Sequence, residues 1–193
     1  MKLPDTPVRS FVALPCPPGL REAIAAARPA WRAAGEGVRW ARPEQLHLTL
    51  RFLGPAGPLR LPALDEGLAA AAAVAPPVRL RPAGPGAFPG WRRPRVLWLG
   101  LDGGPALDAL AGAVEGAARV AGFPEESRPF QPHLTLGRVS DLRAARRCVA
   151  VVREWRPDAG TEEVSEIVLY RSDLEPGGAR HSALARYRLG GSA

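Results

Sequence analysis

The sequence contains a nine-residue repeat, Arg-Pro-x-Gln-x-His-Leu-Thr-Leu, which occurs at residues 42–50 and again at residues 128–136. Two of the three histidines in the chain, His47 and His133, occupy the same place in the two copies. Side chains alternate between the faces of a strand, so the histidine and threonine of each copy share one face and the two leucines share the other. The repeat therefore predicts two related strands that each present an imidazole beside a hydroxyl. The motif residues are His47, Leu48, Thr49, Leu50, His133, Leu134, Thr135 and Leu136.

The patterns around the repeat predict strands and helices in a similar order in each half of the chain. Alternating apolar residues bounded by Gly or Pro predict strands at 8–14, 38–40, 46–53, 78–81, 95–101, 131–139, 164–170 and 183–189. Helical periodicity and capping signals predict helices at 18–34, 61–75, 105–121 and 141–155, the last capped by Ser140, with a Gly/Pro-rich loop at 82–94. We therefore expect an α+β fold, bilobal and pseudo-twofold, with antiparallel sheets lining a central cleft and helices outside. No low-complexity linker separates the halves, so residues 1–193 are expected to form a single bilobal domain.

The chain carries a formal net charge of +7, which favours an anionic partner because clustered cations release counterions when they meet phosphate. Almost all of this charge is arginine, since Lys2 is the only lysine, and Ala, Gly and Pro are also abundant. Such a general compositional bias means that the charge alone does not single out nucleic acid. Cys16 and Cys148 are far apart in the sequence and indicate neither a disulfide framework nor a thiol redox motif.

Two short apolar segments bear on location. The run at residues 11–14 is interrupted by prolines before it could serve as the core of a signal peptide. The alanine-rich run at residues 67–74 is well short of the roughly 20 residues that cross a bilayer. The sequence therefore predicts a cytoplasmic protein with no membrane partner. A monomer is expected because no exposed apolar heptad is evident.

Two imidazoles and two hydroxyls in one cleft can hydrolyse a phosphodiester without a metal. The reaction needs a base for water, an acid for the leaving oxygen, and donors that hold the phosphoryl oxygens. A neutral imidazole serves as the base and a protonated one as the acid, while hydroxyl and guanidinium groups bind the oxygens. A strained cyclic phosphate is the easiest such target. The rate is predicted to be bell-shaped in pH, because one imidazole must be neutral and the other charged.

Other interpretations of the motif fit the residues less well. One copy alone would be an ordinary strand, but two copies with the same upstream Arg, Pro and Gln favour function. Zinc needs three or four ligands, whereas each copy offers one histidine with threonine, not Cys, Asp or Glu, at the neighbouring position on that face. The chain has no Gly-x-Ser-x-Gly elbow and no Walker-type phosphate loop. No metal site and no nucleotide-triphosphate hydrolysis are therefore predicted.

Together these residues resemble a known family, the two-histidine phosphoesterases, and within it the RNA 2',3'-cyclic phosphodiesterases formerly called 2'-5' RNA ligases. The resemblance covers nearly the whole chain. Besides the paired histidine motifs it includes the segments at 11–15, 42–54, 86–89, 94–100 and 128–138. In combination these segments are far more specific than one His-x-Thr motif.

The resemblance implies hydrolysis of a 2',3'-cyclic phosphate at an RNA end to a 2'-phosphate, with no cofactor. It implies that His47 is the acid that protonates the departing 3'-oxygen and that His133 is the base that activates water. Thr49 and Thr135 would hold the phosphate. The implied partner is RNA with such an end, tRNA fragments included, or a small cyclic nucleotide. Since the motifs are nearly symmetric, the residues themselves leave the assignment of acid and base open.

Two alternatives to this activity stay open. The chain could be a non-catalytic RNA-binding module that uses the same cationic cleft. It could also keep the chemistry but act on a small cyclic nucleotide or an ADP-ribose cyclic phosphate.

Several further residues are candidates for contact with substrate. Arg138 matches an arginine that the family places near the phosphate, although simple alternation turns it away from the threonine of its motif. Arg51 lies on the face of the first histidine by counting two residues at a time. Phe130 could stack on a terminal base, although core packing is favoured, and the loop at 91–95 mixes an aromatic residue with cations that suit RNA. His181 stands where related chains often have tyrosine, and it is interpreted as a surface residue in a turn.

Overall fold

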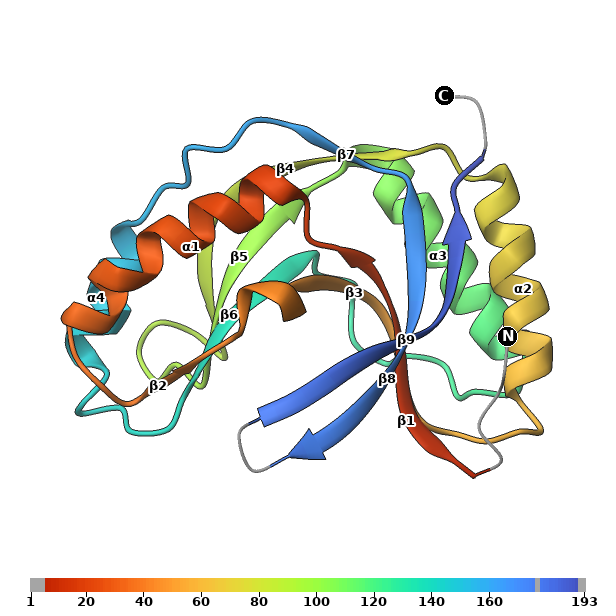
Figure 1. The fold of residues 1–193 in the computed structure, drawn as a ribbon, viewed down its shortest axis with the longest axis horizontal. Helices are drawn as coiled ribbons and strands as arrows, with labels where there is room; N and C mark the ends of the chain where they lie inside the picture. The colour runs from red at the N-terminus through yellow and green to blue at the C-terminus, as the bar shows by residue number, and fades with distance from the viewer. Residues whose placement is uncertain (1–5, 176–177, 191–193) are drawn as a thin grey trace.

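Strands and helices alternate along the chain in an order close to the one that the sequence predicts. The structure is a computed structural model that describes residues 6–175 and 178–190, so Lys2 lies outside the described residues. In chain order the elements are β1 (Val8–Pro15), α1 (Pro18–Ala33), β2 (Val38–Trp40), the short 3-10 helix η1 (Pro43–Gln45), β3 (His47–Ala56), α2 (Leu61–Val74), β4 (Val78–Phe88), β5 (Val96–Asp102), α3 (Gly104–Val120), β6 (His133–Val139), α4 (Arg146–Glu154), β7 (Glu162–Val164), β8 (Glu166–Glu175) and β9 (Gly178–Arg188) (Figure 1).

The two motif strands lie side by side in the middle of the sheet. Every strand pair formed by the described residues is antiparallel, and the strand order is β7-β4-β5-β6-β3-β1-β8-β9, with β2 paired to β6. β3 and β6 meet where Leu48 pairs with Leu134. Because the pairing is antiparallel, its register sets the histidine of each motif opposite the threonine of the other. The predicted α+β fold, with antiparallel strands arranged about a pseudo-twofold centre, is confirmed.

The helices cover the sheet in two pairs, one for each lobe (Figure 1). α1 packs with α4 beside β4, and α2 packs with α3 beside β3 and β9. α1 begins at Pro18, since the fixed φ and missing N–H of proline suit a first helical turn, and it buries Trp31 near its other end. A β-carbon at Gly67 of α2 would lie 2.9 Å from the β-carbon of Ala117 of α3. The small side chains of these helices therefore allow a close approach that a larger residue would prevent.

The main difference from the predicted elements is the length of β4. The sequence predicts a strand that ends at Arg81, because proline cannot donate to a ladder, but β4 continues through Pro82 and Pro85 to Phe88. Its outer neighbour β7 pairs only with residues 78–80, so the prolines lie beyond that pairing, where a missing N–H is tolerated. The predicted Gly/Pro-rich loop is thereby reduced to residues 89–95.

The fourth helix is shorter than predicted and has a different start. It begins at Arg146 rather than at residue 141. The Oδ1 atom of Asp141 accepts hydrogen bonds from the backbone N–H groups of Arg143 and Ala144, at 2.8 Å and 3.1 Å, which holds a turn before the helix. Ser140 donates its hydroxyl to the carbonyl of Gly37 and does not cap the helix. None of the described helices is long and apolar enough to cross a membrane.

Candidate active site

Both motif histidines are anchored in the same way at the start of their strands. The Nδ1 atom of His47 lies 2.7 Å from the carbonyl oxygen of Gln45, and the Nδ1 atom of His133 lies 2.7 Å from the carbonyl oxygen of Gln131. A carbonyl only accepts, so each Nδ1 must carry the proton and donate it. This leaves each Nε2 available for proton exchange. The repeated glutamine thus contributes its backbone carbonyl, which fixes the tautomer of the histidine two residues later.

The imidazole of His47 lies in a cluster of four rings drawn from four strands. Its ring centroid is 4.7 Å from that of Phe11 on β1 and 6.2 Å from that of Tyr170 on β8. The ring of His181 on β9 stands edge-on to it, with 5.1 Å between centroids. The interpretation of His181 as a surface residue in a turn is therefore wrong. β9 begins at Gly178, earlier than predicted, and this places His181 in a strand beside the first catalytic candidate.

The imidazole of His133 has a different pair of neighbours. The rings of Phe88 and Trp98 lie 5.1 Å and 5.9 Å from it, measured between centroids. A β-carbon at Gly86 would lie 2.1 Å from the indole of Trp98, so only glycine allows the indole to lie across β4 at this point. The segment 86–89 that carries part of the family resemblance therefore serves to place the aromatic support of the second histidine.

Burial lowers the pKa of all three imidazoles. It lowers the pKa of His47 to about 4, against the effect of its backbone hydrogen bond, and the like charges of His181 and His133 lower it further. Burial also lowers the pKa of His133, with a contribution from the guanidinium of Arg138, and it lowers the pKa of His181, with a contribution from Arg9. Without substrate these side chains are therefore neutral near pH 7. The negative charge of a bound phosphate would raise the pKa of a nearby imidazole, and so favour its protonated form.

Each motif strand contains a β-bulge at the same place, the fourth motif residue. In β3 the register with β1 shifts between the partners of Thr49 and Arg51, and in β6 the register with β5 shifts between the partners of Thr135 and Gly137. Two consecutive residues then point to the core side, and the following residue returns to the side of the histidine. The two motif strands therefore share a backbone bulge as well as a sequence. The bulge changes the side of the sheet to which the residues after each motif point.

The bulge shows that the expected orientation of Arg51 is wrong. Its side chain is 7% exposed and points away from the cleft, toward α3 and the loop after it. It forms ion pairs with Glu115 and Glu126 and donates to the carbonyl oxygens of Phe52 and Pro124. Arg51 therefore ties the motif strand to α3 and is not placed to bind substrate.

The same bulge has the opposite consequence for Arg138. Simple alternation turns Arg138 away from the threonine of its motif, but the extra residue returns it to the cleft side, where its charge acts on the pKa of His133.

Thr49 and Thr135 are half-buried on the histidine side of their strands, as predicted. Phe130 is half-buried against the hydrophobic core, and its stacking on a base stays a prediction. In residues 6–175 and 178–190, no group of three or more His, Cys, Asp or Glu is arranged to hold a metal ion.

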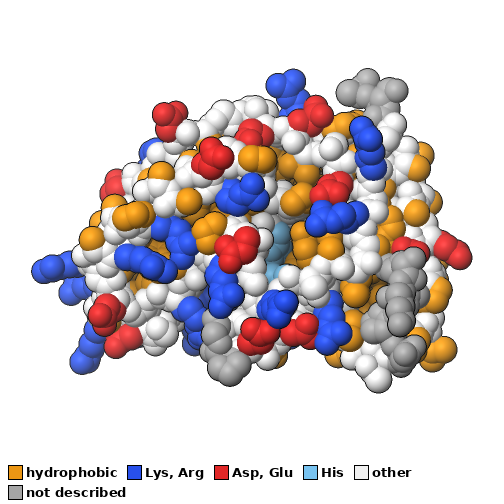
Figure 2. Space-filling model, in the orientation of Figure 1, with side chains coloured by type: hydrophobic (Ala, Val, Ile, Leu, Met, Phe, Trp, Pro, Cys, Tyr) orange, Lys and Arg blue, Asp and Glu red, His pale blue; other side chains and the backbone are white. Residues whose placement is uncertain are grey.

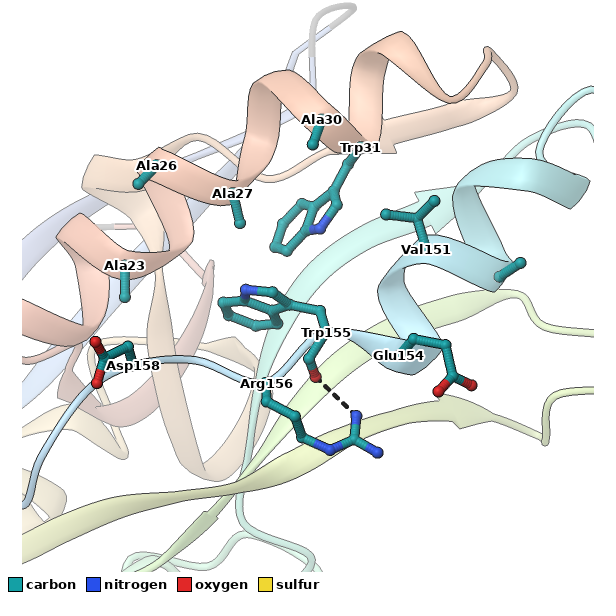
Figure 3. A pocket seen from close by; sticks show the side chains of 11 residues that line it. Ala23, Ala26, Ala27, Ala30, Trp31, Val151, Glu154, Trp155, Arg156 and Asp158 are labelled. Carbon is teal, nitrogen blue, oxygen red and sulfur yellow. Dashed lines mark hydrogen bonds between the residues drawn. The ribbon is translucent and has the colours of Figure 1, made fainter.

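The histidine hollow is distinct from an apolar groove elsewhere on the surface. Figure 2 shows a histidine at the floor of a hollow on one face, with arginine and acidic side chains around it. A separate groove of about 810 Å³ lies between α1 and α4, lined by alanines and by Trp31 and Trp155 (Figure 3). Titratable groups with displaced pKa values gather in the histidine hollow, which makes it the candidate active site.

The lowered pKa values predict a stability that falls in mild acid. Histidines in the unfolded chain take up protons near pH 6.5, whereas the folded chain resists protonation of His47 down to about pH 4. Between these limits the unfolded state binds more protons, so the free energy of unfolding decreases as pH falls from 7 to 4.5. We expect a loss of about 2 kcal/mol, measured by denaturant unfolding at several pH values. A His47→Phe variant should show a smaller slope, and equal slopes would contradict the assignment.

Comparison with known proteins identifies the family. The sequence of residues 16–176 matches the family model described as the 2'-5' RNA ligase superfamily. This chain belongs to that superfamily. It is 31% identical over 183 residues to the RNA 2',3'-cyclic phosphodiesterase of Methanothermobacter thermautotrophicus, a match that covers 94% of this chain and 99% of the relative. It is 34% identical over 190 residues to the RNA 2',3'-cyclic phosphodiesterase of Escherichia coli, covering 95% and 97%.

Solved structures of other proteins share the fold of this chain. TT0787 of Thermus thermophilus has a TM-score of 0.79 at 27% identity, covering 96% of this chain and 100% of that one. E. coli LigT in its apo form has a TM-score of 0.73 at 31% identity, covering 95% and 98%. LigT has also been solved in complex with 3'-AMP. The family predicted from the paired motifs is thus confirmed, together with its fold.

Proposed function

We propose that this member of the superfamily is an RNA 2',3'-cyclic phosphodiesterase that leaves a 2'-phosphate. The observation that carries the proposal is the pair of motif strands, which meet at Leu48 and Leu134 and each hold an imidazole by Nδ1 so that Nε2 is available. Relatives that match nearly the whole chain are RNA 2',3'-cyclic phosphodiesterases, which supports the same conclusion.

In the proposed mechanism the two imidazoles exchange protons with opposite ends of the phosphoryl group. His133 takes a proton from water as the oxygen attacks phosphorus, and His47 gives a proton to the 3'-oxygen as the bond from phosphorus to that oxygen breaks. The product is a 2'-phosphate and a free 3'-hydroxyl. Thr49, Thr135 and Arg138 hold the nonbridging oxygens, whose negative charge also raises the pKa of the imidazole that must begin protonated.

The direct test is to incubate the EDTA-treated protein with an RNA oligonucleotide that ends in a 2',3'-cyclic phosphate. Chromatography that separates 2'-phosphate from 3'-phosphate ends should show only the 2'-phosphate. A 3'-phosphate product would contradict the proposed direction of ring opening. Binding of the oligonucleotide without any product would favour a non-catalytic RNA-binding module. Turnover confined to a small cyclic nucleotide or an ADP-ribose cyclic phosphate would change the substrate but keep the chemistry.

Some finer predictions accompany this proposal. Independence of any cofactor, a monomeric state, a cytoplasmic location and one domain spanning the chain stay predictions from the sequence. The proposed assignment of His47 as acid and His133 as base comes from the family resemblance, and a substrate with a better leaving group can separate the two roles.

A further inference from the structure

Two arginines lie directly opposite each other on neighbouring strands next to the second histidine motif. In the register of β2 with β6, Arg39 pairs with Arg138, and Val96 of β5 pairs with Arg138 on its other side. Residues that pair directly have their side chains on the same side of a sheet, so Arg39 shares the cleft side with Arg138. Like charges in this arrangement destabilise a strand pair. No ion pair among the described residues includes either arginine, so no carboxylate offsets the repulsion.

The opposite lobe, formed by β8 and β9, has a different balance of charge. Three of the four arginines on these two strands have carboxylate partners on the same hairpin. The ion pairs are Arg171 with Asp173 at 2.8 Å, Arg180 with Glu175 at 3.9 Å, and Arg186 with Glu166 at 2.6 Å. These ion pairs lower the net positive charge of the hairpin, whereas Arg39 and Arg138 have no carboxylate partner in the part of the chain that the structure describes, so an anionic chain that leaves the cleft is attracted toward β2 and β6.

Cationic and aromatic side chains continue beyond the end of β6. The backbone N–H of Val139, the residue after Arg138, donates to the carbonyl of Arg95 at 2.9 Å, which brings the loop between β4 and β5 to this end of the strand. A hollow of about 310 Å³ lies between that loop and the start of α4. Its lining consists of Trp91, Arg92, Pro94, Leu142, Arg143, Arg146 and Val149. An indole and several guanidinium groups suit an unpaired base and its phosphates.

We propose that the RNA strand upstream of the terminal phosphate leaves the cleft across β6 and β2, and that Arg39 binds the phosphodiester next to the terminal one. This inference rests on the proposed function, since it assumes that the terminal phosphate lies at the two motifs. Arg138 lies about 7 Å along the strand from Thr135, after allowance for the bulge. Arg39 is one strand further from the histidines, where it contacts a second phosphate and not the reacting one.

The test compares a substrate that has a second phosphate with one that lacks it. An RNA pentamer ending in a 2',3'-cyclic phosphate and a nucleoside 2',3'-cyclic monophosphate are assayed with the wild type and with Arg39→Gln. The variant should lose about tenfold in kcat/KM on the pentamer, the size of one charge-assisted contact, and keep its kcat/KM on the mononucleotide. The dependence of pentamer binding on salt should also decrease by about one unit in the log–log slope.

Two control variants make the result specific. Arg119→Gln removes one charge from α3 and should leave kcat/KM unchanged on both substrates, whereas Arg186→Gln tests the opposite lobe, where Arg186 shares the side of Tyr170. Thermal unfolding of Arg39→Gln should occur at or above the wild-type temperature, because the change relieves the repulsion with Arg138. A loss of kcat/KM on the pentamer in Arg186→Gln but not in Arg39→Gln would overturn the proposed path, as would equal losses on both substrates in Arg39→Gln.

Failure of the proposed function can be told apart from failure of this path. If the wild type hydrolyses neither substrate, the proposed function is rejected, and the path is judged by fluorescence anisotropy of the labelled pentamer. Arg39→Gln must then weaken binding of the pentamer about tenfold. Unchanged binding in that variant would overturn the path.

Discussion

Replacing either His47 or His133 by alanine is expected to lower kcat on a 2',3'-cyclic phosphate about 10³-fold, the loss typical of one general acid or base. Each imidazole is held in place by a backbone carbonyl and by neighbouring rings, so alanine removes a proton carrier that is already positioned for the reaction. The double variant should be little worse than either single variant, because both groups act in one step. The measurement is kcat by product chromatography, with circular dichroism to show that each variant is folded. Either single variant with full activity would reject the mechanism.

A substrate with a good leaving group separates the acid from the base. A nucleoside 2'-(4-nitrophenyl phosphate) releases a phenolate that needs no proton, so a variant that lacks only the acid recovers most of its rate on it. If His47 is the acid, His47→Ala should recover on this substrate while His133→Ala should not. The opposite pattern would exchange the two roles. The pKa of about 4 makes His47 the harder histidine to protonate in the free protein, so the acid role requires that the bound phosphate raise this pKa.

Sequence patterns were sufficient to predict the parts of the fold that depend on local signals. The helix at Pro18–Ala33 follows from a proline in its first turn and a glycine just beyond its end, and the motif strands follow from alternation. The placement of His47 and Thr49 on one face was predicted correctly for the same reason. These features depend on residues within a few positions of one another.

The bulges could not be predicted, because the fourth motif residue is a leucine that looks the same in a regular strand and in a bulged one. Their effect is specific: Arg51 turns to the core side and Arg138 turns to the cleft, the reverse of simple alternation. His181 was missed for a different reason. It reaches His47 only through the pairing of β9 with β8 and of β8 with β1, and a single sequence contains no local signal for such a contact.

Replacing Arg51 by alanine is expected to lower the free energy of unfolding by about 3 kcal/mol and to leave KM for substrate unchanged. The guanidinium is buried between β3 and α3, and its loss leaves the partly buried carboxylate of Glu115 without its partner. Glu126 is more exposed and can turn toward water when Arg51 is absent, so the loss of its ion pair lowers the free energy of unfolding by less. Denaturant unfolding measures the loss of stability, and steady-state kinetics at a temperature where the variant is folded measures KM.

A double variant distinguishes an ion pair that stabilises the fold from an arginine that binds substrate. Arg51→Met with Glu115→Leu replaces both charges by apolar side chains of similar length, which costs much less than breaking the pair. The double variant should therefore recover most of the stability lost in Arg51→Ala and retain activity. If Arg51 bound the phosphate, both variants would raise KM at least tenfold whatever their stability, because neither has a guanidinium. If the double variant recovers stability and its KM is unchanged, Arg51 stabilises the fold and does not bind substrate. Of Arg51 and Arg138, only Arg138 would then be directed toward the substrate by its bulge.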